Sequence, residues 1–368
     1  MKSLKIIYIA VFFLICAAPS LLMGILGGSG TAEKRTFAPM PKLITGSGLN
    51  SKFGDGFDAY ISDRFAFRQQ LVTLNALISH KIFGTSSEDS VIAGKDGWLF
   101  FAQTVDSYTV RNSPDRQEVL DITEDLYAVK EYCEDKGADF IFTVAPNKNT
   151  VYGEYMPDNY LRVFDLQMYD IFGYRYPVYL DNSPPFPNYC NLISVLTDGA
   201  SEAAPELLYH KWDSHWNNRG ALLAYRTVMD FSGIPYDGYA GISPQLLRDW
   251  DGDLYGMLYP SLNEKDWQYH YGIDFTYEIT SPYISPEDVT VTTENPNGNG
   301  KLLVYRDSFC NALLPFFAQH FKEAYFSRIT PYDLSLIDEF QPDLVIIEIA
   351  ERNVPLLANN IQLARNNE

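Results

Sequence analysis

The first 26 residues carry a pattern that the rest of the chain lacks. After Lys2 and Lys5, residues 6–26 are predominantly apolar and uncharged. At about 1.5 Å per helical residue, this run can cross a hydrocarbon core of roughly 30 Å, which predicts a membrane helix or a long signal peptide. The run exceeds the usual signal-peptide core of about 7–15 residues and shows no clean small-x-small cleavage site, so an uncleaved anchor is favoured. The two preceding lysines predict that the chain from about Gly28 onward lies outside the cell membrane.

Beyond a short tether at residues 28–45, helix-like and strand-like patterns alternate. Helix-like spacing of apolar residues covers 53–83 (one or two helices), 117–136, 217–230 and 309–321, and short apolar β-rich runs cover 98–101, 138–145, 301–305 and 344–349. This alternation predicts an α/β fold with a mainly parallel central sheet flanked by helices, whose sites form at the carboxyl ends of strands. The run at 138–145 is expected to end in a polar loop at 146–149.

Residues 275–293 alternate in a different way, as antiparallel strands. We expect them to form a small insertion on the main sheet. Because no internal linker is long enough to require a second domain, residues 46–368 are predicted to form a single domain after an anchor at 1–27 and the tether at 28–45.

Composition narrows the classes of function. With 368 residues and 46% hydrophobic content, the chain can bury a large core and is predicted to be globular. The 28 basic and 47 acidic residues give a net charge of −19, which argues against nucleic-acid binding because phosphate contacts need a basic surface. The 26 tyrosines offer flat surfaces on which sugar rings can stack, although core packing explains such a count equally well.

The four cysteines are too few for a disulfide framework. Cys16 lies in the apolar run, and Cys310 follows the serine motif described below. Cys133 and Cys190 are left as the pair that can form one bond in an oxidising compartment. Isolated apolar residues are the alternative, and the sequence does not decide between them.

Two short motifs, far apart in the sequence, carry the candidate chemistry. Residues 212–216 read Trp-Asp-Ser-His-Trp, and the apolar run at 302–305 leads into Arg-Asp-Ser-Phe. Asp213 and His215 are two apart in an extended segment, so their side chains point to one face. Ser308 lies at a strand-to-helix turn, where a nucleophile is exposed. Together they predict a split Ser-His-Asp site and acyl transfer through a serine ester.

Each residue has a role in this hypothesis. Ser308 is the nucleophile, His215 removes its proton, and Asp213 orients the imidazole and stabilises the imidazolium. The backbone N–H of Ser308 is the expected first donor to the oxyanion, and the Asn147 side chain is the expected second. The structural alternatives are helix caps for Ser308 and Asp213, a hydrogen-bonded loop histidine for His215 and a turn residue for Asn147.

A zinc site is a second interpretation of the same region. His210, Asp213 and His215 offer three ligands within six residues, and such a set can leave an open position for water. Their spacing does not match a helical His-x-x-x-His pair, and a zinc site would leave Ser308 without a catalytic role. We therefore expect no metal and no cofactor.

Six segments follow one another in an order that resembles a known family. They are 94–100 (GKDGWLF), 146–148 (PNK), 152–157 (YGEYMP), 213–217 (DSHWN), 307–309 (DSF) and 351–352 (ER). Over roughly residues 37–355 the chain resembles the SGNH-hydrolase-like alginate O-acetyltransferase family, the AlgJ/AlgX and DHHW-like group. The Asp-x-His motif precedes the serine, which resembles the permuted order of this group.

The resemblance implies an SGNH-hydrolase-like fold and a function. The implied protein is an extracytoplasmic O-acetyltransferase that moves acetyl groups onto an exopolysaccharide or cell-wall glycan, beside a membrane-bound O-acyltransferase that supplies acetyl. Many relatives in the wider superfamily have glycine before Asp-Ser, whereas this chain has Arg306, so Arg306 becomes a further candidate for contact with the oxyanion or substrate. An acetylesterase with the same triad and a non-catalytic glycan-binding or assembly protein stay open as alternatives.

Overall fold

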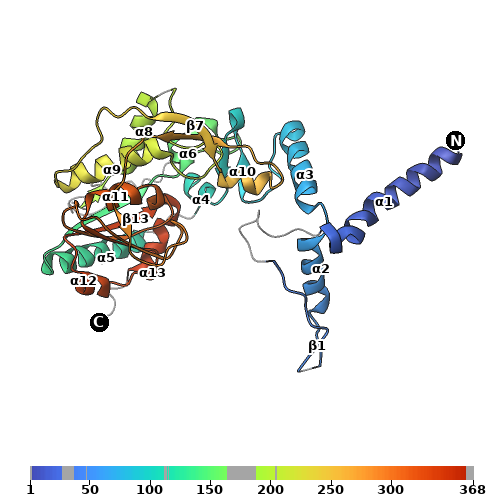
Figure 1. Cartoon of the computed structure of the whole chain (residues 1–368), viewed down its shortest axis with the longest axis horizontal. Helices are drawn as coiled ribbons and strands as arrows, with labels where there is room; N and C mark the ends of the chain where they lie inside the picture. Colours follow the sequence, from blue (N-terminus) through green and yellow to red (C-terminus); the bar gives the residue numbers. More distant parts are fainter. Residues whose placement is uncertain are drawn as a thin grey trace. The chain divides into compact units, whose positions relative to one another are not determined.

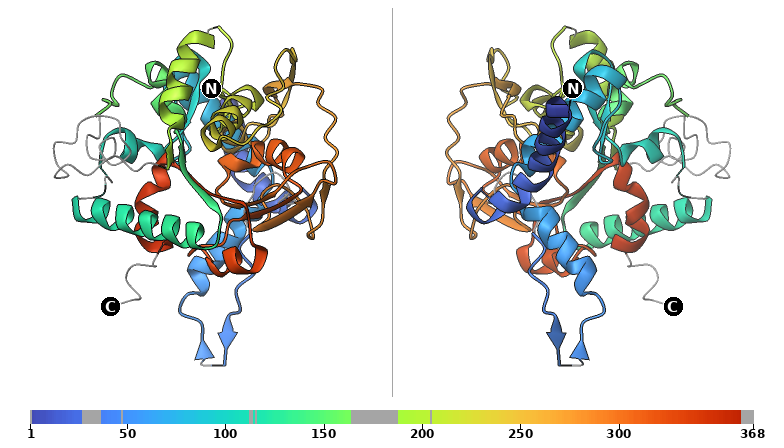
Figure 2. Two further views of the ribbon diagram at one scale, coloured as in Figure 1. Left: turned by 90° about the vertical axis from the view of Figure 1, so that its left-hand side faces the viewer. Right: turned by 90° about the vertical axis from the view of Figure 1, so that its right-hand side faces the viewer.

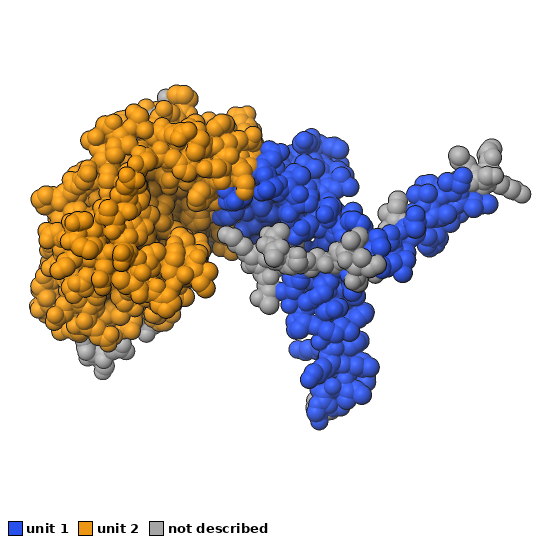
Figure 3. Space-filling model, viewed as in Figure 1, with its two compact units in different colours: residues 1–93, 251–264 blue, residues 94–250, 265–368 orange. Residues whose placement is uncertain are grey.

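The computed structural model describes residues 2–26, 37–46, 48–111, 114, 116–163, 188–203 and 205–361. The chain divides into two compact units, one of residues 1–93 with 251–264 and one of residues 94–250 with 265–368 (Figure 3). The residues predicted to form a single domain, 46–368, are therefore shared between both units. Residues 28–36, half of the predicted tether at 28–45, lie outside the described residues.

The first unit begins with a long apolar helix, α1 (Lys2–Leu26). Its segment Lys5–Met23 has a mean hydropathy of 2.5 and is not buried. Among the described residues, this helix alone is long and apolar enough to cross a membrane, by length and composition. It coincides with the predicted anchor.

The predicted helical stretch at 53–83 forms two helices, α2 (Phe53–Arg64) and α3 (Arg68–Phe83). They are separated where Phe65 is extended and Phe67 has a left-handed φ of 64°. A non-glycine residue in that region cannot continue a right-handed helix. The unit also contains a hairpin of β1 (Ile44–Thr45) and β2 (Gly48–Leu49), the strand β3 (Val91–Ala93) and the helix α10 (Asp253–Leu258).

A seven-stranded sheet forms the centre of the second unit, in the order β6-β5-β13-β11-β12-β10-β9 (Figure 1). The first five strands are parallel: β6 (Tyr189–Cys190), β5 (Asp139–Ala145), β13 (Leu344–Ala350), β11 (Lys301–Tyr305) and β12 (Glu323–Ser327). The strands β10 (Thr290–Glu294) and β9 (Glu278–Ile279) pair antiparallel at one edge. The mainly parallel sheet is thus confirmed, and the predicted antiparallel segment extends this sheet at its edge.

Helices cover both faces of the sheet (Figures 1 and 2). One face carries α5 (Arg116–Asp135), α12 (Ser335–Phe340) and α13 (Leu357–Asn360), and the other carries α8 (Leu192–Ala203), α9 (Asn218–Ser232) and α11 (Leu314–His320). In α5, Ile122, Leu126 and Val129 recur at helical spacing and are fully buried in a core shared with β5 and β13. Burying each such side chain contributes about 1.5–3 kcal/mol.

Shorter elements complete the second unit. They are η1 (Lys95–Gly97), β4 (Leu99–Phe101), α4 (Thr104–Tyr108), α6 (Lys148–Val151), η2 (Gly153–Tyr155), the antiparallel pair β7 (Gln245–Trp250) and β8 (Asp266–His270), η3 (Phe309–Ala312) and η4 (Glu351–Leu356). The polar loop expected at 146–149 was a wrong prediction, because residues 148–151 form α6 and are buried. The helix expected at 309–321 is divided into η3 and α11.

Cys133 and Cys190 are separate, free thiols in the structure. Cys133 lies in α5 and Cys190 in β6, and both are buried. Burial raises the pKa of each thiol to about 12. Both therefore fit the interpretation of isolated apolar residues.

Candidate active site

The two predicted motifs meet at the carboxyl end of the sheet. Ser308 lies three residues after the end of β11 and directly before η3. Asp213 and His215 lie in a loop closed by a backbone bridge between Tyr209 and Trp216, just before α9. The side chain of Asn217 caps α9 by accepting hydrogen bonds from the backbone N–H groups of Arg219 and Gly220. This cap fixes where the loop ends.

Asp213, His215 and Ser308 form a continuous hydrogen-bonded relay. His215 Nδ1 lies 2.7 Å from Asp213 Oδ1, and His215 Nε2 lies 2.8 Å from Ser308 Oγ. The backbone N–H of His215 also donates to Asp213 Oδ1, at 3.0 Å. One ring nitrogen of His215 therefore contacts the carboxylate and the other contacts the serine hydroxyl, as a catalytic triad requires.

The second oxygen of Asp213 is also bound. Trp250 Nε1 donates to Asp213 Oδ2 at 3.0 Å. Burial by itself raises the pKa of Asp213, but the hydrogen bonds and charge of His215, with the nearby His210, hold it well below its usual range. The carboxylate is therefore ionised wherever His215 is able to act as a base.

Lys148 holds the loop that carries Asp213. It is buried at the start of α6, and its ammonium donates to the carbonyls of His210 (3.1 Å), Lys211 (3.1 Å) and Asp213 (2.5 Å). The same ammonium lies 5.6 Å from the ring centroid of Trp98 and 5.2 Å from that of Phe100. An ammonium has three donors, and these three bonds match that number.

The turn at Ser308 is fixed by its neighbours. Asp307 Oδ1 accepts from the backbone N–H of Phe309 at 2.9 Å, and Oδ2 accepts from that of Ala350 at 2.5 Å. The Asp307 backbone N–H donates to Glu348 of β13 at 3.1 Å. Burial and then the charge of Asp307 raise the pKa of Glu348 well above its ordinary value. The serine is thereby tied to the adjacent strand.

Asn147 lies at the end of β5, as predicted. Its backbone N–H donates to Glu351 Oε2 at 2.8 Å, and Thr150 Oγ1 donates to the same oxygen at 2.6 Å. The side-chain amide of Asn147 is buried, and both its polar atoms are without a hydrogen-bond partner within the described residues. A buried amide left in that state costs about 1–3 kcal/mol, which singles it out as a candidate for function.

Arg306 is buried and directed to a neighbouring loop. Its guanidinium donates to the carbonyls of Pro286 (2.8 Å) and Asp288 (3.1 Å) and to the side chain of Asn311 (2.5 Å). Burial lowers its pKa. These contacts commit most of the guanidinium to holding the loop, so the geometry gives Arg306 a structural use next to the nucleophile.

His210 is engaged by protein groups at both ring nitrogens. Nδ1 lies 2.9 Å from the carbonyl of Trp267, and Nε2 lies 3.4 Å from the amide of Gln268. The ring stacks on Trp250 at 4.7 Å, and burial lowers its pKa. These partners occupy both ring nitrogens of His210 and give the ring a packing role.

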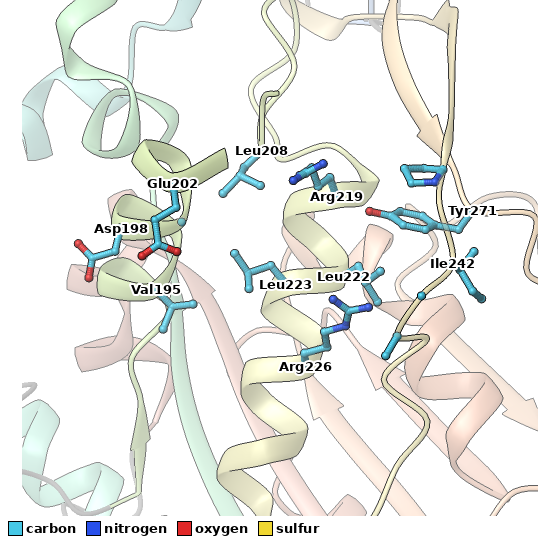
Figure 4. Close-up of a pocket in the computed structure, with 14 residues that line it drawn as sticks. Val195, Asp198, Glu202, Leu208, Arg219, Leu222, Leu223, Arg226, Ile242 and Tyr271 are labelled. Atoms are coloured by element: carbon cyan, nitrogen blue, oxygen red, sulfur yellow. The ribbon is translucent and has the colours of Figure 1, made fainter. Parts of the chain in front are cut away.

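Two cavities in the second unit lie apart from the triad. Figure 4 shows one of about 810 Å³, in which Arg219 and Arg226 of α9 are opposite Asp198 and Glu202 of α8, with Tyr271 beside the arginines. The other, of about 730 Å³, is lined by aromatic residues that include Trp98, Tyr152 and Tyr155. Neither is lined by Asp213, His215 or Ser308.

Part of the chain matches a known family of proteins. Residues 91–177 match the family model described as "SGNH hydrolase-like domain, acetyltransferase AlgX". The chain has an SGNH-hydrolase-like fold. The resemblance inferred from the sequence motifs is thereby confirmed for this part of the chain.

A curated relative and two solved structures extend the comparison. A probable alginate O-acetylase AlgJ of Pseudomonas syringae pv. tomato is 27% identical over 158 residues, which cover 43% of this chain and 37% of the relative, so the match spans well under half of that protein. A DHHW family protein from Eubacterium siraeum is 17% identical with a TM-score of 0.50, covering 73% of this chain and 94% of its own. Bacillus cereus PatB1 is 17% identical with a TM-score of 0.54, covering 72% and 96%. At this identity the two structures establish the fold.

Proposed function

We propose that the protein is an extracytoplasmic O-acetyltransferase that moves acetyl groups onto a polysaccharide through an acetyl-serine intermediate at Ser308. The observation that carries this proposal is the relay of Asp213, His215 and Ser308, with distances of 2.7 and 2.8 Å. Such a relay activates a hydroxyl for attack on an ester carbonyl.

The proposed reaction has two steps. In the first, Ser308 Oγ bonds to the acetyl carbonyl carbon while its proton moves to His215 Nε2, and the departing group of the donor takes that proton as its bond breaks. In the second, a sugar hydroxyl gives its proton to His215 and attacks the acetyl-serine, so that the acetyl ester forms on the sugar and Ser308 Oγ recovers a proton. Asp213 remains ionised throughout and stabilises the imidazolium.

Two donors are proposed for the oxyanion that forms in each step. The first is the backbone N–H of Ser308. The second is the side-chain amide of Asn147, whose unpartnered state within the described residues leaves it free to donate to a substrate oxygen. Removing such a donor typically costs about 100–1,000-fold in rate.

The comparisons support acetyl as the acyl group and a polysaccharide as the acceptor. The matching family model is described as an acetyltransferase, and the curated relative is named an alginate O-acetylase. The apolar helix α1 fits a single-pass anchor with the sheet unit outside, or a secreted form if it is cleaved. Because an extracytoplasmic site has no direct access to cytoplasmic acetyl donors, we propose a membrane-bound O-acyltransferase as the partner that supplies acetyl.

Intact mass spectrometry tests the first step. The full chain in detergent is incubated briefly with 4-nitrophenyl acetate, beside its Ser308→Ala variant. One added acetyl group in the parent, absent from the variant, is the expected result. No adduct and no released acetate in either protein would refute the enzyme and favour a glycan-binding or assembly protein.

The fate of the acetyl group separates transfer from hydrolysis. Ester appearing on an added glycan supports the transferase, whereas release of free acetate at the same rate with and without glycan supports an acetylesterase. The same relay serves both reactions, and they differ in whether sugar or water reaches the acetyl-serine.

A further inference from the structure

Arg352 lies beside the proposed nucleophile but has no part in the relay. It belongs to η4, which follows β13 at the same end of the sheet as Ser308. Its guanidinium carbon lies 5.5 Å from the ring centroid of Phe101 and 5.6 Å from that of Phe309. Two aromatic rings therefore hold this one cation.

This arrangement leaves the donors of Arg352 available. Aromatic rings attract a guanidinium through cation–π contact and stacking, whereas its N–H groups lie in its own plane. No hydrogen bond or ion pair of the guanidinium is found within the part of the chain that the structure describes, and the side chain is partly exposed. The cation is thus fixed in place with its hydrogen-bonding capacity unused.

The neighbouring acid does not neutralise this charge by direct contact. Glu351 accepts from the backbone N–H of Asn147 and from Thr150 Oγ1. Its carboxyl is buried, and burial raises its pKa. The chain has a net charge of −19, and Arg352 is a partly exposed arginine with no ion pair to an acidic side chain among the described residues.

The position of Arg352 relative to the triad follows from Phe309. Phe309 is the residue after Ser308, and its ring centroid lies 4.8 Å from that of His215. Arg352 contacts the same ring, so the guanidinium and the imidazole are both neighbours of Phe309. The guanidinium therefore packs on the same ring that contacts the imidazole of the relay.

We propose that Arg352 is an acceptor-binding residue, and that its N–H edge binds a pair of oxygens on the sugar that receives the acetyl group. This inference rests on the proposed function and adds to it the group that recognises the acceptor. Paired oxygens are the chemistry that the planar fork of arginine matches, and they come from a sugar carboxylate or from neighbouring hydroxyls.

The test separates acyl-enzyme formation from transfer. Full-length parent, Arg352→Met and Arg352→Lys are acetylated with 4-nitrophenyl acetate, and the initial burst measures Ser308 acylation. Decay of acetyl-serine is then followed with increasing cellotriose, a neutral acceptor, or trigalacturonate, an acidic one. Arg219→Met is the matched control, because Arg219 also lies over an aromatic ring, Tyr269 at 5.9 Å, but is paired with Glu206 and lines the cavity in Figure 4.

We expect all four proteins to show the same burst within about twofold, which also reports that the variants fold. In Arg352→Met, the acceptor-dependent decay constant falls roughly 10–100-fold, the loss expected for a charge-assisted hydrogen-bonded contact. Arg352→Lys keeps the charge without the fork and gives an intermediate value. A fall confined to trigalacturonate assigns the oxygens to a carboxylate, and an equal fall with both sugars assigns them to hydroxyls.

Three outcomes of the decay measurement overturn the inference. They are unchanged acceptor dependence in Arg352→Met, an equal fall in Arg219→Met, and an acetyl-serine in the parent whose decay neither sugar accelerates. A burst lost together with transfer in Arg352→Met would place the residue in acylation and also reject an acceptor role. Absence of any burst in the parent is a different result, because it refutes the proposed function itself.

Discussion

Replacing Lys148 by methionine tests whether the triad depends on a buried ammonium. The substitution keeps an unbranched side chain of similar length but removes the donors to the carbonyls of His210, Lys211 and Asp213. Losing a partner costs about 1 kcal/mol or more for each buried group, so three carbonyls predict a loss of about 3 kcal/mol in the free energy of unfolding. At roughly 2–4 °C per kcal/mol for a unit of this size, the melting temperature should fall by about 6–12 °C.

The same change should slow acylation of Ser308. The bond to the Asp213 carbonyl, at 2.5 Å, is the shortest of the three and lies on the residue that orients His215. A shift of about 1 Å in such a group costs on the order of 100-fold in rate, so the burst with 4-nitrophenyl acetate should be about 100-fold slower at a temperature where the variant is folded.

Lys211→Met provides the control. The Lys211 ammonium lies 5.7 Å from the ring centroid of Trp98, close to the 5.6 Å of Lys148, and within the described residues it donates to none of these carbonyls. The Lys211→Met variant should therefore have the same melting temperature and the same burst rate as the parent. Equal effects of the two substitutions would refute the reasoning, and a lower melting temperature with an unchanged burst in Lys148→Met would show that the ammonium supports the fold without setting the triad.

Three further substitutions test other parts of the site. Trp250→Phe keeps a ring against His210 but removes the donor to Asp213 Oδ2, so we expect a burst about 5–10-fold slower, the equivalent of one hydrogen bond; an unchanged burst contradicts this. Asn217→Ala removes the cap of α9 and should lower the unfolding free energy in urea by about 1 kcal/mol, whereas Asn217→Asp keeps the capping oxygen but loses the bond from Nδ2 to the Leu207 carbonyl and should recover only part of that loss. Glu348→Gln tests whether the pKa of this buried carboxyl is raised. The unfolded carboxyl ionises above a pH of about 4.3, while burial raises the folded pKa well above that value, so the parent loses stability as the pH rises from there toward the folded pKa and the variant does not. The urea midpoint of the variant relative to the parent should therefore increase between pH 4 and pH 8, and a constant difference would contradict a raised pKa.

The sequence predicted the long, strongly patterned elements well. The helix α5 and the strands β5, β11 and β13 lie within one or two residues of their expected bounds, because apolar spacing there directly reflects burial. β12 and the hairpin of β7 and β8 were not predicted. The residues of β7 are all exposed, so that strand has no apolar alternation to detect, and it is defined by its partner strand.

The candidate site also contains residues that the sequence indicates and residues that only the fold reveals. Asp213 and His215 were found because their spacing is local, and Ser308 because it follows a strand. Trp250 was missed, since it reaches Asp213 from 37 positions away in a segment without a motif. Lys148 belongs to the segment 146–148 that resembles the family, but only the fold reveals that its ammonium is directed to the loop that carries Asp213 and His215. Contacts of this kind depend on tertiary structure, which residue spacing does not encode.

The groups that hold the relay in place do not decide between transfer and hydrolysis. Lys148, Trp250 and Glu348 fix the loop and turn that carry the triad, and none of them discriminates sugar from water. A triad alone acylates its serine and then reacts with whichever hydroxyl arrives, so the outcome depends on a group that concentrates the sugar at the acetyl-serine. Arg352 is fixed beside Phe309 with its donors unused within the described residues, which makes it suited to that task. If it performs this role, Arg352→Met should hydrolyse its acetyl-serine as fast as the parent while failing to transfer it, and so convert a transferase into an esterase.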